Sequence, residues 1–137
     1  MKFNIPKIIR PLEMVDYDDA MEGLALQVWV NPPRGIRNEN WDFQLELLKL
    51  SSELKEITKQ EEPDDKKIAR LDKKIATLNK ELYVWFARLW SQAKDPDTHV
   101  AVEEIEAMTE EDPAIWGFMT NGTLELIRDH AENVRKN

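Results

Sequence analysis

The sequence predicts a mainly α-helical protein of the α+β class, with an antiparallel helical hairpin, C-terminal helices and a small N-terminal two-stranded β element. Two long stretches in the middle of the chain place apolar residues three and four positions apart, which is typical of helices that pack lengthwise on a partner. An earlier stretch alternates apolar with other residues, as a half-buried strand does. A proline-containing acidic turn joins the two helical stretches and predicts that they run antiparallel.

The length of 137 residues fits one domain, covering residues 1–137, with its own hydrophobic core. We divide it into a β element at residues 1–33, the hairpin at residues 41–93 and acidic C-terminal helices at residues 97–137. A hydrophobic content of 42% and a charged content of 34% exclude a disordered tail and a membrane protein. We expect no signal peptide, because Pro6 and Lys7 interrupt the first apolar residues.

The β element rests on the alternation within residues 24–30. Its first strand falls within residues 3–9, and Pro6 and Pro11 confine that strand to an edge of the sheet. We expect one helical turn in the acidic connection between the two strands. Two strands alone are marginally stable in water, so the pair must pack on helices.

The hairpin is expected from helices at residues 41–60 and 65–91, joined by the turn around Pro63. Antiparallel pairing places Leu54 opposite Leu71 and Leu50 opposite Ile75. The apolar seams of the two helices comprise Phe43, Leu47, Leu50, Leu54 and Ile57, then Ile68, Leu71, Ile75, Leu78, Leu82, Trp85 and Leu89. We expect the aromatic end of the second helix to dock on the β element.

The C-terminal part predicts a short helix through residues 102–108, capped by Asp97 or Thr98, and a second helix that begins near Pro113. Asn121-Gly122 either breaks this last helix into two or lies inside it, and we favour one interrupted helix. The polar tail at residues 128–137 is expected to fray.

The charge distribution argues against nucleic acid as a partner. Residues 95–137 contain 11 acidic and 3 basic residues, which accounts for the whole net charge of −8, whereas nucleic-acid binding requires a basic patch. Cysteine is absent, which fits a reducing compartment. We therefore expect a cytoplasmic protein that binds neither nucleic acid nor membrane.

The motifs of enzyme chemistry are incomplete. His99 and Glu103 have the i,i+4 spacing of a helix, but two ligands do not hold a zinc ion. The acidic segment around Asp16 and Asp18 begins like a calcium loop, yet Met21 occupies the position that requires glycine. We expect no enzyme activity, no catalytic residue, no cofactor and no metal.

Tryptophan suggests instead that the chain binds a protein. Five tryptophans exceed what a core of this size requires, and tryptophan dominates the energetic centres of protein interfaces. Trp85 fits the helical seam and is expected in the core. The candidate partner-binding residues are Trp29, Trp90, Trp116 and Phe118.

The chain also resembles the tail assembly chaperones of long-tailed bacteriophages and prophages. The likeness lies in the β element ending in residues 28–33 (VWVNPP), the two charged helices after it, and residues 112–117 (DPAIWG) before a helix with a basic and polar end. Arg10-Pro11-Leu12 and Asp16-Tyr17 fit the same pattern, whereas the lysine-rich middle hairpin departs from it.

The resemblance implies a non-enzymatic helper of virion assembly, located in the host cytoplasm, that binds the long helical tape-measure protein. It carries over no catalytic residue. One alternative is a coiled-coil adaptor or structural phage component, such as a connector or minor tail protein, retained in the particle. A second is a small enzyme with an unrecognised site, which the missing nucleophiles and metal motifs disfavour. The identity of the partner, the host and the oligomeric state are left open, self-association included.

Overall fold

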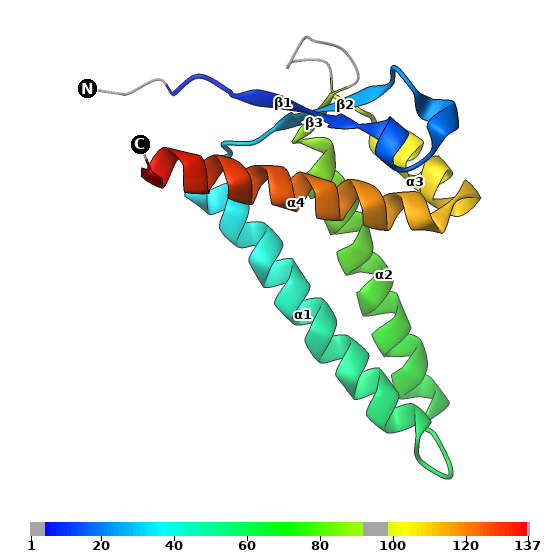
Figure 1. The fold of residues 1–137 in the computed structure, drawn as a ribbon. Coiled ribbons are helices and arrows are strands. Elements are labelled where there is room, and N and C mark those ends of the chain that lie inside the picture. Colours follow the sequence, from blue (N-terminus) through cyan, green and yellow to red (C-terminus); the bar gives the residue numbers. More distant parts are fainter. Residues whose placement is uncertain (1–4, 92–98, 137) are drawn as a thin grey trace. The chain divides into compact units, whose positions relative to one another are not determined.

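The computed structural model describes residues 5–91 and 99–136, and it is mainly helical with a small antiparallel sheet, as predicted (Figure 1). It divides into two compact units. One unit consists of Met1–Pro32 and Phe86–Asn137, and the other is the continuous segment Pro33–Trp85. Among the described residues, no helix is both long and apolar enough to cross a membrane.

The sheet of the first unit has three strands in the order β1-β2-β3. Strand β1 (Ile9–Glu13) pairs antiparallel with β2 (Ala25–Trp29), which pairs antiparallel with the two-residue β3 (Trp90–Ser91). In β2, Leu26 and Val28 are buried between half-buried neighbours, so the predicted alternation is confirmed. Pro11 lies in an edge strand, as its missing N–H requires. The position predicted for this strand, within residues 3–9, was wrong, because the strand begins only at Ile9.

The prediction of two strands was wrong by one strand. Residues 90 and 91 were assigned to the second helix because the aromatic run before them continues its apolar spacing. Helix α2 (Asp65–Ala87) ends earlier, and the backbone N–H of Trp29 donates to the Leu89 carbonyl at 2.8 Å, beside the first residue of β3. The connection from β1 to β2 contains two short 3-10 turns, η1 (Met14–Asp16) and η2 (Asp19–Met21), where we expected one turn.

Helices α3 (Val102–Glu111) and α4 (Pro113–Lys136) complete this unit. They pack on one another, and α4 also packs on β1 and β2. Ile105, Ile115 and Met119 are buried at these contacts. The N-cap of α3 is Ala101, and the predicted caps Asp97 and Thr98 lie outside the described residues.

Helix α4 runs through Gly122 without a break, so the predicted interruption was wrong. A Cβ atom on Gly122 would lie 2.7 Å from Leu12 Cδ1, which shows that the glycine marks a close approach of α4 to β1. The helix continues to Lys136, so the tail that was expected to fray is helical. Glycine inside a helix costs about 1 kcal/mol relative to alanine, and close approach of another element is a reason to keep it.

The second unit is the predicted antiparallel hairpin, formed by α1 (Arg34–Thr58) and the hairpin part of α2. Helix α1 begins seven residues before the predicted start. Ile36 and Asn40 extend the spacing of the seam towards the N-terminus. Because Asn40 is polar, the apolar pattern does not include this position, yet the residue is buried. The Trp85 indole N–H donates to the Ile36 carbonyl at 2.7 Å and holds the first turn of α1 to the end of the hairpin.

Candidate protein-binding surfaces

The four predicted partner residues all lie in the first unit, and Trp90 is the most deeply buried of them. Its side chain has no exposed surface, and its indole N–H donates to Thr123 Oγ1 at 2.8 Å. Thr123 is also fully buried, and its hydroxyl donates to the Met119 carbonyl at 2.7 Å. Trp90 is therefore a core residue in this structure, because it belongs to β3 rather than to the exposed side of a helix.

Trp116 joins Trp90 in an aromatic cluster. Its half-buried ring meets Phe86 and Trp90 edge-on, at centroid distances of 5.3 and 5.9 Å. Phe118, also half-buried, lies 5.3 Å from the ring of Tyr17. The rings of Phe118 and Tyr17 are tilted by 45° to one another. Edge-on and offset aromatic pairs stabilise a core beyond the area that they bury. Both side chains therefore have a structural role and retain part of their surface.

Trp29 is separate from that cluster. It is half-buried on β2, and Lys7 Nζ lies 4.6 Å from the centroid of its ring, a cation–π distance. Its indole nitrogen is buried without a hydrogen-bond partner among the described residues. The structure thus brings Trp90 and Trp116 together and leaves Trp29 in other surroundings.

A hydrogen bond fixes the connection between β1 and β2 to the junction of α3 and α4. The Tyr17 hydroxyl donates to Asp112 Oδ2 at 2.5 Å. This bond to the carboxylate raises the pKa of Tyr17 to about 12, and desolvation and the charges of Asp112 and Asp18 act in the same direction. The connection is therefore held against both helices.

The connection, β2 and the two helices line an open apolar pocket of about 510 Å³. Four of the five methionines in the chain line it. The lining residues are Met14, Met21, Leu24, Ala25, Leu26, Met108, Ile115 and Met119. We call this cavity the methionine pocket. Leu24, one of the residues that line this pocket, is 59% exposed.

Methionine side chains are flexible and polarisable, and they are common on surfaces that adapt to different apolar partners. Exposed carboxylates are carried by the same elements that form the methionine pocket. Asp19 and Glu22 lie on either side of Met21 in the sequence, and Glu110 and Glu111 follow Met108 on α3. This arrangement suits an apolar side chain presented beside basic residues.

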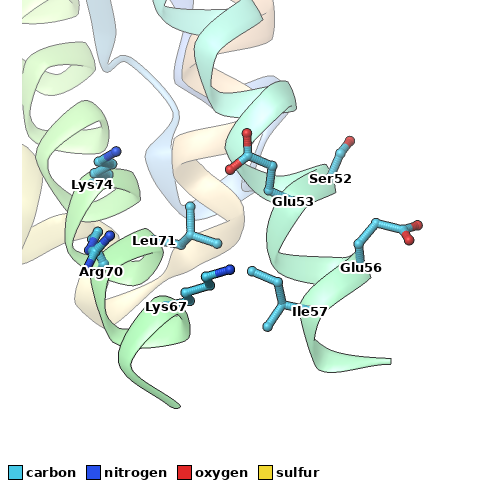
Figure 2. Close-up of a pocket in the computed structure, with 8 residues that line it drawn as sticks. All are labelled: Ser52, Glu53, Glu56, Ile57, Lys67, Arg70, Leu71 and Lys74. Carbon is cyan, nitrogen blue, oxygen red and sulfur yellow. The ribbon is translucent and has the colours of Figure 1, made fainter. Parts of the chain in front are cut away.

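The hairpin unit carries a second cavity, of about 500 Å³, between α1 and α2 near their turn. Figure 2 shows Ile57 and Leu71 pointing into the space between the two helices. Charged residues surround them, acidic on α1 and basic on α2. The cavity is lined by Ser52, Glu53, Glu56, Ile57, Lys67, Arg70, Leu71 and Lys74. We call it the hairpin groove.

Sequence reasoning missed an apolar stripe on α1. Trp41, Leu45 and Leu48 are 65%, 48% and 66% exposed. Their i, i+4, i+7 spacing is visible in the sequence, but it is shorter than the main apolar seam of the same helix. The methionine pocket left no comparable signal, because its residues come from five separate elements.

The structure does not place His99 and Glu103 on the same helix. His99 precedes the first residue of α3, so the helical i,i+4 spacing with Glu103 does not apply. Within residues 5–91 and 99–136, no group of three histidine or carboxylate side chains is arranged to hold a metal ion.

Comparison of the chain with known protein families, with curated proteins and with solved structures finds no match in any of the three.

Proposed function

We propose that this chain is a non-enzymatic protein-binding factor that receives an apolar side chain of a helical partner in the methionine pocket. The gathering of four methionines around one cavity, with Leu24 exposed beside it, is the observation that carries this proposal. An apolar cavity of this size accommodates one or two large side chains.

The resemblance of the sequence to tail assembly chaperones suggests the class of partner. We propose that the partner is the long tape-measure protein of a phage tail and that the chain keeps it soluble during assembly. The acidic residues on the elements that form the methionine pocket would then steer basic segments of the partner, which raises the association rate more than the affinity.

The test is co-expression with the long coiled-coil protein encoded near the tail-tube gene, followed by pull-down and binding kinetics. Leu24→Glu places a charge beside the methionine pocket and should abolish binding. Val134→Glu is the matched control, because Val134 is 62% exposed on α4 and lies outside the residues that line this pocket. Added salt should slow association and leave dissociation nearly unchanged.

Two outcomes would contradict the proposal. Equal binding by both variants would show that the methionine pocket is not the binding site. A partner that stays insoluble with the wild-type chain would exclude the chaperone role. Copurification with mature particles would favour the structural phage component instead.

A further inference from the structure

The hairpin groove combines an apolar floor with rows of opposite charge on its two walls. Ile57 and Leu71 form the floor. Glu53 and Glu56 belong to α1, and the basic residues Lys67, Arg70 and Lys74 belong to α2. The groove lies wholly within the hairpin unit, so its properties are independent of the proposed function of the methionine pocket.

The apolar seam of the hairpin is incompletely covered. Leu50, Leu71 and Leu82 are buried, whereas several other seam residues remain half-buried. The half-buried members are Phe43, Leu47, Leu54, Ile57, Ile68, Ile75 and Leu78. Figure 1 shows why, since α1 and α2 diverge from their turn. A further helical surface laid along the groove would bury what the two helices leave exposed.

The charged walls are available for an external partner. All five charged side chains of the groove are exposed. In the described part of the chain they form no ion pair with one another, and Figure 2 shows the Glu56 carboxylate pointing away from α2. The occupant must therefore carry positive charge where it meets α1 and negative charge where it meets α2.

A second copy of this chain carries that pattern. A two-fold axis parallel to the hairpin places α1 of one copy over α2 of the other, and it preserves the distance of every residue from the turn. Glu56 and Lys67 lie in the helical turns nearest the loop, and Glu53 and Arg70 lie one turn further away. Each acidic row of α1 then meets the basic row of α2 of the other copy at the same distance from the turn. The two-fold symmetry produces this contact twice.

We propose that the hairpin groove is the interface of a homodimer, in which two hairpins pack face to face as a four-helix bundle with their turns at the same end. The charges also select this orientation. A two-fold axis across the hairpins would place α1 over α1, and acidic residues would then face acidic residues, which is unfavourable. A foreign helix would need both charge rows in the matching order.

The test uses two complementary charge reversals. Glu53→Lys with Glu56→Lys makes both walls basic. Lys67→Glu with Arg70→Glu reverses two of the three basic residues on α2 and leaves Lys74, so both walls are then predominantly acidic. The wild-type chain should have twice its mass of 16.1 kDa in light scattering at about 100 µM. Each double variant should dimerise at least about 100-fold more weakly, and an equimolar mixture of the two should recover the dimer.

Glu103→Lys with Glu110→Lys on α3 is the matched control, since it changes charge equally on another exposed helix. It should leave the dimer intact. Circular dichroism should show unchanged helix content in all variants, because every substituted residue is exposed. A monomeric wild-type chain, a mixture that stays monomeric, or wild-type dimerisation by either double variant would each overturn the proposal.

Discussion

Tyr17 links two parts of the first unit that are far apart in the sequence. Its hydroxyl donates to Asp112, and its ring lies against Phe118. Local sequence patterns gave no sign of this pairing, because 95 positions separate the tyrosine from the carboxylate. Such pairs are fixed by the assembled fold, and they fall outside what spacing and propensity can predict.

The raised pKa of Tyr17 makes this hydrogen bond measurable through pH. The folded chain holds the phenol proton up to about pH 12, whereas the unfolded chain releases it near 10.0. The stabilisation is therefore complete below pH 10 and is lost as the pH rises towards 12. Urea unfolding at several pH values should show a steeper loss of stability for the wild type than for Tyr17→Phe.

Tyr17→Phe keeps the aromatic ring and removes the hydroxyl. The other ionisable groups are present in both proteins, so their contributions cancel in the comparison. Identical pH profiles would mean that the bond to Asp112 does not form in solution.

The two glycines of α4 predict opposite responses to alanine. A Cβ atom at Gly117 meets nothing within 4 Å, so Gly117→Ala should raise the free energy of unfolding by about 0.5–1 kcal/mol through helix propensity. At Gly122 the added atom meets Leu12, which should cancel part or all of that gain. Thermal unfolding of both variants measures the difference. An equal gain in the free energy of unfolding at both sites would show that the Leu12 side chain moves away from the added methyl group at no cost.

At the scale of elements, apolar periodicity predicted the hairpin well. Its spacing identified the inward face of both helices, and Leu50 and Leu71 are buried as expected. The boundaries were predicted less well. The start of α1 was missed because Asn40 occupies a seam position, and β3 was missed because two residues are too few to show alternation.

Two leucines of α1 test which face of this helix packs in the seam and which faces solvent. Leu50 is 4% exposed, and Leu48 is 66% exposed on the same helix. Leu50→Ala should lower the free energy of unfolding by about 2–5 kcal/mol, because it leaves a cavity in the seam. Leu48→Ala should change it by less than about 0.5 kcal/mol. Chemical denaturation measures both, and similar losses would contradict the assigned face.

At the scale of the whole molecule, the hairpin segment interrupts the sequence of the first unit, which is therefore discontinuous. The flanks of this insertion lie side by side, because the Trp29 N–H donates to the Leu89 carbonyl. Replacing residues 34–84 by a short glycine–serine loop should therefore leave a folded first unit. Its near-ultraviolet circular dichroism should retain the signal of Phe86, Trp90 and Trp116 and lose it cooperatively on heating. A weak signal without a transition would show that this unit needs the hairpin to fold.

The methionine pocket could not be predicted from the sequence, because it exists only once several elements have packed together. Its eight residues come from η1, η2, β2, α3 and α4 and the bend before β2. Nothing in their individual positions distinguishes them from ordinary core residues. The tryptophans were the more visible signal, yet Trp90 is a core residue in this structure and Trp116 is half-buried in the aromatic cluster.

The same insertion has a kinetic consequence. Bringing Leu89 to Trp29 from an unfolded chain closes a loop of about 60 residues, which carries a large entropic cost. A hairpin built from local contacts forms early and shortens that loop before the strands meet. Leu71→Ala, which weakens the hairpin, should therefore act on the folding limb of a chevron plot and slow folding. Met119→Ala, in the core of the discontinuous unit, should mainly speed unfolding. The two results together would show that formation of the inserted hairpin limits the rate at which β2 and β3 pair.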